Sequence, residues 1–192
     1  MLKDLILKTR SFRSFDTSVK VTEEALCELV DHARFTASSM NLQILKFRFV
    51  TEQNEVKAVQ NSVRWATKVR DVIELPPVGH EPAAFIVICC DKNVYPAADS
   101  LLIDVGIAAE AIMLAATEMG LGGCMMSSFS KDTLPSLLDL PEGVEPKLVL
   151  ALGKPDETVE LTTPAEDGNV TYYRENGVHY VRKRTLDDLI VK

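Results

Sequence analysis

The segment from Thr9 to Phe15 reads T-R-S-F-R-S-F and follows a short stretch whose apolar residues have helical spacing. It places Arg10, Ser11 and Arg13 together at the end of the predicted helix. Arginine presents a planar, always-charged fork that matches phosphate oxygens, and each charge-assisted hydrogen bond contributes about 1.5–3 kcal/mol. We interpret the segment as an anion site. The alternative is that both arginines pair with some of the chain's 28 acidic residues.

Length and composition favour one globular domain over residues 1–192, since no linker, repeat or low-complexity tract divides a chain that is 46% hydrophobic. A net charge of −7 disfavours nucleic-acid binding, which depends on clustered lysines and arginines. The N-terminus shows no signal-peptide pattern, and no apolar run reaches the length of about 18 residues that spans a bilayer. We therefore expect a cytoplasmic protein without membrane association.

The four cysteines and three histidines show no spacing typical of metal ligands. Cys89 and Cys90 are adjacent, so in a strand their side chains would point to opposite faces. We interpret the cysteines as small hydrophobic residues and expect no metal site.

Apolar periodicity and cap residues predict helices interleaved with about four or five strands, and hence an α+β fold with a central mixed sheet flanked by helices. The expected helices are a short one around Leu2 to Ile6, one from the N-cap Thr22 to about Arg34, and others over 52–62, 103–119 and 131–138. The expected strands cover Phe47 to Val50, Ala83 to Cys90, Cys124 to Met126, Lys147 to Leu152, and 172–182 with a hairpin turn at Asn176-Gly177. Asp16 to Lys20 and Thr162 to Asn169 are expected to be loops, and Thr185 to Ile190 a short helix or an extended arm.

The helix expected over 103–119 is apolar on nearly all sides and rich in alanine. Such a helix must also be buried on nearly all sides. The residues leave open whether one subunit or two would bury it.

Three further segments carry small, polar and basic residues. They are A-S-S-M-N-L-Q from Ala37 to Gln43, G-L-G-G-C-M-M-S-S-F from Gly120 to Phe129, and V-R-K-R from Val181 to Arg184, with L-G-K-P at 152–155. With the first segment, and in this order, they resemble the nitroreductase family of FMN-dependent oxidoreductases over nearly the whole chain. Thr36-Ala37 replaces the proline that the family usually has there, and Ile44 replaces the proline after Gln43, so the turn is expected to be less stiff.

The resemblance implies a nitroreductase-like fold in an intertwined homodimer, with the apolar helix near its centre and the segment from about 170 to 192 closing the flavin site or the dimer. It implies FMN as cofactor, NADH or NADPH as electron donor, and a nitroaromatic, quinone or similar small acceptor in a ping-pong cycle. Hydride would be received at N5 of the flavin, so no side chain is expected to act as a catalytic group.

The resemblance also implies the cofactor-binding residues. Arg10, Ser11 and Arg13 match residues that hold the FMN phosphate and ribityl chain, and a basic pair near the C-terminus matches residues that close on the same phosphate. That pair is Arg182 and Arg184, with Lys183 between them. Taken without the resemblance, V-R-K-R is an ordinary charged strand end.

Two further groups are implied to surround the flavin ring. Ser38, Ser39, Asn41 and Gln43 belong to a turn that reaches over the flavin bound mostly by the other subunit, although S-S-M-N is also a good post-helix turn. Ser127 and Ser128 match a segment whose backbone N–H groups face N5 and O4. Trp65, Lys68 and Arg70 fall near a region that can contact the ring edge, where a core or surface role is the alternative.

Other functions stay open at this point. The chain could bind flavin without turnover, as a carrier, a sensor or a regulated reductase component. It could also keep the fold and catalyse another reaction, as the reductive dehalogenases, flavin-degrading enzymes and azoline oxidases of this family do.

Overall fold

The computed structural model describes residues 1–66, 75–97 and 102–191. The chain forms two compact units, Met1–Pro155 and Asp156–Lys192. No helix within the described ranges is long and apolar enough to span a membrane.

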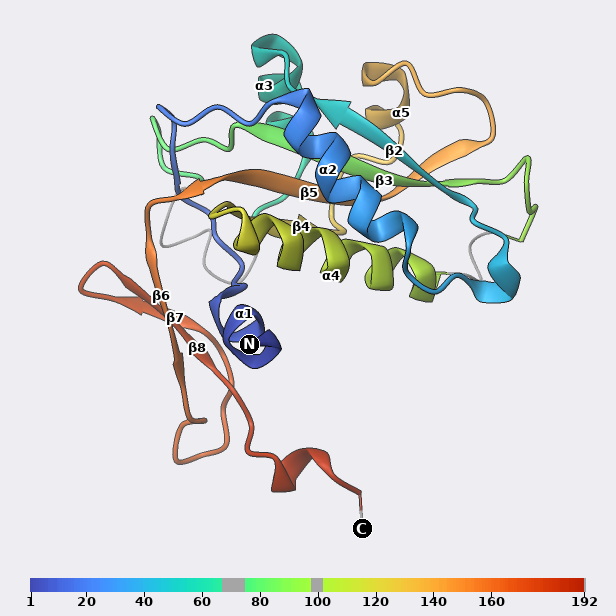
Figure 1. Cartoon of the computed structure of the whole chain (residues 1–192). Helices are drawn as coiled ribbons and strands as arrows, with labels where there is room; N and C mark the ends of the chain where they lie inside the picture. The colour runs from blue at the N-terminus through green and yellow to red at the C-terminus, as the bar shows by residue number, and fades with distance from the viewer. Residues whose placement is uncertain (67–74, 98–101, 192) are drawn as a thin grey trace. The chain divides into compact units, whose positions relative to one another are not determined.

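The larger unit combines helices with a five-stranded sheet (Figure 1). Its elements in chain order are α1 (Leu2–Lys8), β1 (Phe15–Asp16), α2 (Glu23–Arg34), the 3-10 helix η1 (Ser39–Asn41), β2 (Leu45–Val50), α3 (Gln53–Ser62), β3 (Ala84–Asp91), α4 (Leu102–Glu118), β4 (Gly122–Met126), α5 (Leu134–Leu137) and β5 (Val144–Pro155). The Thr22 hydroxyl accepts a hydrogen bond from the Ala25 N–H at 3.3 Å, which confirms the predicted N-cap of α2. The α+β fold is thus confirmed.

The strands of this sheet run in the order β1-β5-β3-β2, and β4 also pairs with β5. The named strands pair antiparallel, while an isolated parallel bridge joins Ser11 to Gly123. β5 therefore pairs with three strands, β1, β3 and β4, while β2 pairs with β3.

All eight residues of β3 are buried, which confirms the prediction of a strand covered on both faces. Ile86, Ile88 and Cys90 belong to a hydrophobic cluster with residues of α2 and α4. Phe85, Val87 and Cys89 belong to a second cluster with residues of α3 and α5. Adjacent Cys89 and Cys90 therefore do face opposite sides, and burial, with a smaller effect of Cys90, raises the pKa of Cys89 to about 12.

α4 confirms the predicted long apolar helix, but the described residues do not bury all of it. Ala109, Ile112 and Ala116 are almost completely buried, whereas Ile103 is 74% exposed and Ile107 is 37% exposed. One side of α4 therefore presents apolar side chains that the described part of the chain leaves uncovered.

The smaller unit is a three-stranded sheet of β6 (Thr158–Thr162), β7 (Tyr173–Glu175) and β8 (Val178–Arg182), followed by the 3-10 helix η3 (Asp187–Leu189). β6 pairs parallel with β8, and β7 pairs antiparallel with it. The predicted hairpin is confirmed, because Asn176 (φ 50°) and Gly177 (φ 80°) both take the left-handed conformation of a tight two-residue turn.

Three predictions about elements were wrong. α5 covers only Leu134–Leu137, because residues 131–133 form a turn and Pro135 lacks the N–H that would extend the helix backwards. Asp16 was expected in a loop but pairs with Lys154 of β5. β6 was not predicted, and residues 1–66, 75–97 and 102–191 contain eight strands where four or five were expected.

Candidate functional site

The segment after α1 is tied to two other elements. The Thr9 hydroxyl lies 2.9 Å from the Thr117 hydroxyl of α4. The Phe12 N–H donates to the Gly123 carbonyl of β4 at 2.8 Å, beside the bridge between Ser11 and Gly123. The strip from Arg10 to Arg13 is therefore attached to β4 through Ser11 and Phe12.

Arg10, Ser11 and Arg13 all lie on this strip, and the two arginine side chains contact different backbone carbonyls. Arg10 Nη2 donates to the Ile6 carbonyl at 2.7 Å, and Arg13 Nη1 donates to the Ser11 carbonyl at 3.2 Å. Burial lowers the pKa of Arg10, and the nearby Glu110 carboxylate acts in the opposite direction. The buried Arg10 Nε finds no hydrogen-bond partner among the described residues.

This donor set fits an anionic ligand such as the FMN phosphate. A buried N–H without a partner is unfavourable by about 1–3 kcal/mol, so an anion that reaches Arg10 would satisfy it. Ser11 is exposed beside it and offers a hydroxyl.

β4 links this strip to the predicted ring-binding residues. Gly123 must be glycine, because an added Cβ would lie 1.9 Å from the Ala151 carbonyl oxygen of β5. Ser127 and Ser128 follow β4 and are both exposed. At a strand rise of about 3.3 Å per residue, Ser127 lies about 13 Å along the chain from Gly123.

A short ladder fixes the segment around Ser128. The Arg64 N–H donates to the Ser128 carbonyl at 2.9 Å, and the Ser130 N–H donates to the Ser62 carbonyl at 2.9 Å. An antiparallel bridge between residues 63 and 129 joins the two bonds. The backbone of Ser127 and Ser128 is therefore held between β4 and these bonds, and we call it the Ser127–Ser128 platform.

Of the three residues predicted near the ring edge, only Trp65 is described, since Lys68 and Arg70 lie outside the described residues. Trp65 is 7% exposed and packs in the cluster with α3 and α5. Its indole N–H is buried and has no hydrogen-bond partner in the described part of the chain. Trp65 therefore has a core role and also carries an unused donor.

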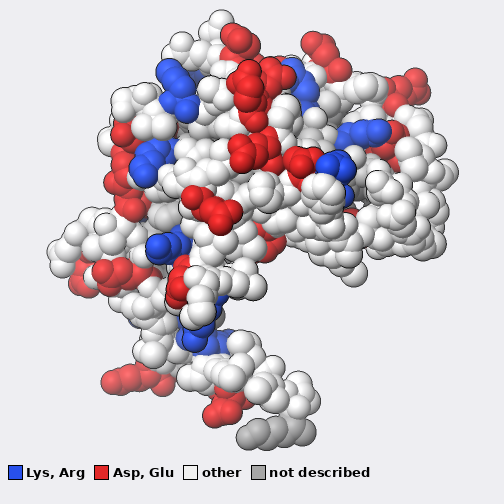
Figure 2. Space-filling model, viewed as in Figure 1, with Lys and Arg blue, Asp and Glu red and all other residues white. Residues whose placement is uncertain are grey.

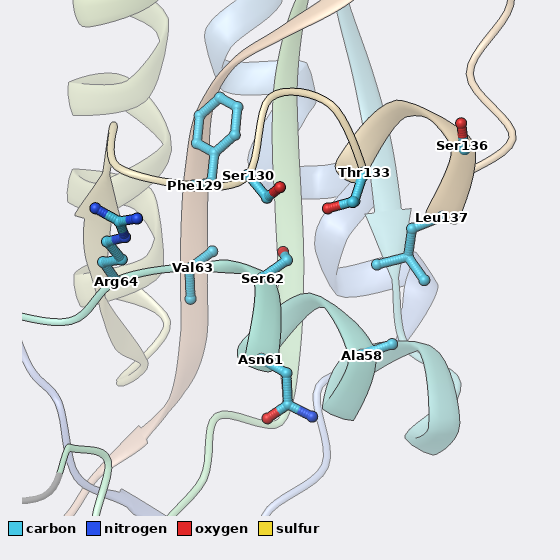
Figure 3. Close-up of a pocket in the computed structure, with 10 residues that line it drawn as sticks. All are labelled: Ala58, Asn61, Ser62, Val63, Arg64, Phe129, Ser130, Thr133, Ser136 and Leu137. Atoms are coloured by element: carbon cyan, nitrogen blue, oxygen red, sulfur yellow. The ribbon is translucent and has the colours of Figure 1, made fainter.

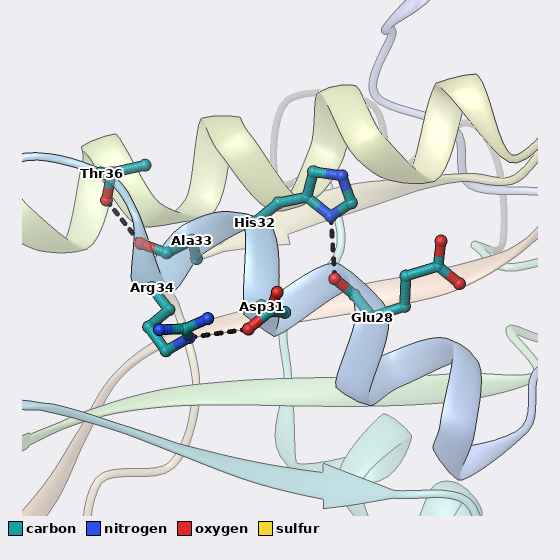
Figure 4. A network of polar contacts seen from close by, with 6 residues as sticks. All are labelled: Glu28, Asp31, His32, Ala33, Arg34 and Thr36. Carbon is teal, nitrogen blue, oxygen red and sulfur yellow. Dashed lines mark hydrogen bonds and ion pairs between the residues drawn. The ribbon is translucent and has the colours of Figure 1, made fainter.

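The end of α2 leads into the turn that contains Ser38 (Figure 4). The Thr36 hydroxyl donates to the Ala33 carbonyl at 2.7 Å, and Arg34 Nε lies 2.7 Å from the Asp31 carboxylate. His32 Nδ1 lies 2.8 Å from the Glu28 carbonyl one turn earlier. The Thr36 bond satisfies a carbonyl at the end of the helix, and the other two contacts lie within its last turns; the helix ends at Arg34, as the sequence predicted.

Ser38 and Ser39 hold a buried carboxylate that the sequence analysis missed. The Ser38 hydroxyl donates to Asp104 Oδ2 at 2.9 Å, the Ser39 hydroxyl donates to Oδ1 at 2.7 Å, and the Ser39 N–H lies 2.9 Å from Oδ2. Asp104 is 2% exposed. Burial alone would raise its pKa, but the hydrogen bonds from Ser39 and Ser38 outweigh it and hold the pKa of Asp104 below its usual value. One signal existed in the sequence, namely an acid in the first turn of the apolar helix α4.

The turn that Asp104 holds has an unusual backbone. Met40 (φ 52°), Asn41 (φ 53°) and Gln43 (φ 49°) all lie in the left-handed region. Non-glycine residues in this region carry strain, which persists where surrounding contacts determine the conformation. Asn41 and Gln43 are exposed, whereas Ile44, at a family proline position, is fully buried.

Arg182 and Arg184 belong to the smaller unit. The Arg182 guanidinium lies 4.8 Å from the centre of the Tyr173 ring, and its Nη1 donates to the Thr171 carbonyl at 3.4 Å. Tyr173 in turn stacks on Tyr180, with 5.0 Å between ring centres. Arg184 is exposed. Their convergence with Arg10 on one phosphate stays a prediction.

The distribution of charged side chains and of potential metal ligands bears on which ligands the protein could bind. Acidic and basic side chains are interspersed on the face shown in Figure 2. No group of three His, Cys, Asp or Glu within the described ranges could hold a metal ion.

Comparison with known proteins identifies the family. Residues 6–154 match the model of the nitroreductase family. The chain belongs to the nitroreductase family. The resemblance stated from the sequence motifs is thereby confirmed.

Relatives agree with this membership. The chain is 27% identical to the NADPH-flavin oxidoreductase of Vibrio harveyi over 172 residues, covering 82% of this chain and 67% of the relative. A solved structure of NADPH:FMN oxidoreductase from Vibrio harveyi complexed with NAD+ is similar with a TM-score of 0.67 and 26% identity, covering 97% of this chain and 80% of that one. A nitroreductase family protein from Streptococcus pneumoniae TIGR4 matches over 100% of both chains with a TM-score of 0.73 and 18% identity, which supports the nitroreductase fold.

Proposed function

We propose that this nitroreductase family member is an FMN-dependent oxidoreductase that passes reducing equivalents from NADH or NADPH to a small acceptor such as a nitroaromatic or a quinone. The observation that carries the proposal is the buried Arg10 Nε, which has no hydrogen-bond partner among the described residues and lies on a strip attached at Ser11 to Gly123 of β4, the strand that leads to Ser127 and Ser128. FMN is itself elongated, with an anion at one end and a ring at the other. When bound, it supplies the two-electron redox chemistry.

The residues of the chain have distinct roles in this proposal. Arg10, Arg13 and the Ser11 hydroxyl bind the phosphate, and backbone N–H groups of Ser127 and Ser128 orient the ring. Charge-assisted hydrogen bonds of this kind are stronger than neutral ones, so the arginines supply most of the cofactor affinity. No side chain is assigned as a catalytic acid or base.

The other proposed cofactor-binding residues belong to other segments of the chain, either in the same copy or in a partner copy. Arg182 and Arg184 close on the phosphate. Ser38, Ser39, Asn41 and Gln43 form the turn that reaches over the flavin. In this arrangement donor and acceptor use the same site in turn, so parallel lines in double-reciprocal plots, as expected of ping-pong kinetics, are predicted.

We also propose that the protein is a homodimer with α4 near its centre. The exposed apolar side chains of Ile103 and Ile107 support the proposal, since a second copy would cover them. The segment from about 170 to 192 closes the flavin site or the dimer. Exposed apolar residues at its end, Leu186 (72% exposed) and Leu189 (66% exposed), support that role.

The cofactor site is tested by changing Arg10→Ala together with Arg13→Ala. Loss of two charge-assisted contacts of about 1.5–3 kcal/mol each weakens FMN binding by roughly a hundredfold to ten-thousandfold. Fluorescence titration with FMN measures this change, and circular dichroism checks the fold. The double variant Lys3→Ala with Lys20→Ala removes the same charge from exposed positions and retains affinity. Full flavin occupancy in the arginine variant would refute the site.

Turnover is tested separately by the visible spectrum of the FMN-loaded protein under anaerobic conditions. Loss of the visible absorbance after addition of NADH or NADPH supports the oxidoreductase and identifies the donor. A bound flavin whose absorbance stays unchanged with both nucleotides would favour a carrier or sensor instead.

A further inference from the structure

A cavity separate from the proposed FMN site opens between the end of α3 and the loop that leads into α5. It has a volume of about 740 Å³. Pockets for small organic ligands typically measure about 300–1,000 Å³. None of its lining residues belongs to the FMN site proposed above. Three of them, Ser62, Arg64 and Ser130, do take part in the backbone hydrogen bonds that fix the segment around Ser128.

The lining mixes polar and apolar side chains (Figure 3). The described residues that line the cavity are Ala58, Asn61, Ser62, Val63, Arg64, Phe129, Ser130, Thr133, Ser136 and Leu137. Four of them carry hydroxyl groups, one an amide and one a guanidinium, and the other four are apolar. None of these lining residues is acidic, in a chain whose net charge is −7.

The polar groups are available to a ligand. The Ser62 hydroxyl donates to the Val59 carbonyl at 2.8 Å and keeps its lone pairs free to accept. The side chains of Ser130 and Thr133 make no hydrogen bond to another described residue, and their hydroxyls point toward the middle of the cavity in Figure 3. The lining therefore offers several unused hydroxyl donors.

Arg64 is the only charged residue among the described lining residues. Its backbone is fixed by the bond to Ser128, while its side chain is exposed and forms no ion pair or hydrogen bond with the rest of the described chain. Asp132, in the loop beside the cavity, is not among the lining residues. An uncommitted guanidinium beside hydroxyl groups and an apolar wall suits a ligand with one negative charge and an apolar body.

We infer that this cavity binds a small organic anion, with Arg64 holding the carboxylate or similar group, the hydroxyls of Ser130 and Thr133 contacting its polar atoms, and Phe129 and Leu137 contacting its apolar body. This inference does not depend on the flavin or on turnover. Because the Arg64 N–H also donates to Ser128, a ligand here would lie against the platform assigned to the flavin ring, a consequence that rests on the proposed function.

The test is calorimetric titration of the FMN-loaded protein with benzoate and with benzamide, its neutral counterpart of similar shape. We expect benzoate to bind at least about tenfold more tightly than benzamide, since the charge-assisted contact is absent from the amide. Arg64→Gln removes this preference, and Arg64→Lys retains part of it. Lys131→Gln, which removes an exposed charge of the same loop outside the cavity, leaves it unchanged.

The position of the bound benzoate is checked by chemical-shift changes of backbone amides. The expected changes are centred on residues 62–64 and 129–133. Equal binding of benzoate and benzamide, unchanged benzoate affinity in Arg64→Gln, or shift changes confined to the Arg10 segment would each overturn the inference. Since Arg64 is exposed, its substitution tests binding without disturbing the core.

Discussion

Replacing Asp104 by asparagine tests the contacts that hold the turn after α2. The carboxylate accepts from two hydroxyls and one backbone N–H at 2.7–3.1 Å. Asparagine keeps one acceptor oxygen, so in either amide orientation at least one hydroxyl faces the amide NH2 and loses the oxygen to which it donated. A lost charge-assisted bond of about 1.5–3 kcal/mol, with weaker remaining bonds, predicts a loss of about 2–4 kcal/mol in the free energy of unfolding.

Urea denaturation at pH 7 measures this loss, and its pH dependence tests the cause. The pKa of Asp104 is lowered in the folded state, so its contribution is fully present above the unfolded-state pKa of about 3.9 and is lost as the pH falls through the folded-state value. The difference between Asp104→Asn and the unchanged protein should therefore shrink as the pH falls below about 4.

Two comparisons make the test specific. Ser39→Ala combined with Asp104→Asn should destabilise less than the sum of the single changes, because both remove the same contact. Asp188→Asn is a matched control, since Asp188 also accepts from a hydroxyl and an N–H, those of Thr185, but is exposed, so a much smaller effect is expected. Wild-type stability of Asp104→Asn at pH 7 would refute the assigned role.

Other changes probe other parts of the molecule. Gly123→Ala should destabilise the protein by about 3 kcal/mol or more in urea denaturation, because the new methyl group overlaps the Ala151 carbonyl oxygen; a neutral effect would contradict the close approach of β4 and β5. Ile103→Glu should convert the proposed dimer to monomer in sedimentation, whereas Val78→Glu, at an exposed loop position, should leave the dimer intact. Iodoacetamide should label the folded protein once, at the exposed Cys27, and labelling of further thiols seen by mass spectrometry would contradict the burial of the other three.

The sequence was sufficient where local chemistry determines local structure. The run from Ala83 to Cys90 predicted a strand covered on both faces, and Asn176-Gly177 predicted a hairpin, because β-branched runs and left-handed turn residues act over short distances. The motif order predicted the family. Within the first segment, the structure attaches Ser11 and Phe12 to Gly123 of β4, while the joint binding of one anion by Arg10 and Arg13 stays a prediction.

Contacts between residues far apart in the chain could not be predicted from the sequence. Asp104 and Ser39 are 65 residues apart, and neither residue type signals a partner at that distance. β6 was missed because it is short and pairs parallel with β8, which lies further along the chain. Parallel strands need a long connection, so no pattern within Thr158–Thr162 itself predicts this pairing. The cavity at Arg64 likewise forms only when α3 and the loop before α5 come together.

The position of β5 in the chain has a consequence for folding. β5 is the last strand of the larger unit, yet β1, β3 and β4 all pair with it, and Phe15 pairs with Pro155. During synthesis, β1, β3 and β4 emerge before β5 is made. A chain that stops before Val144 therefore lacks the pairings of these three strands with β5. Contacts between such distant residues slow folding and prolong the exposure of unpaired apolar strands. The nascent protein therefore completes its larger unit late, and β3 is the segment that most needs protection from aggregation until then.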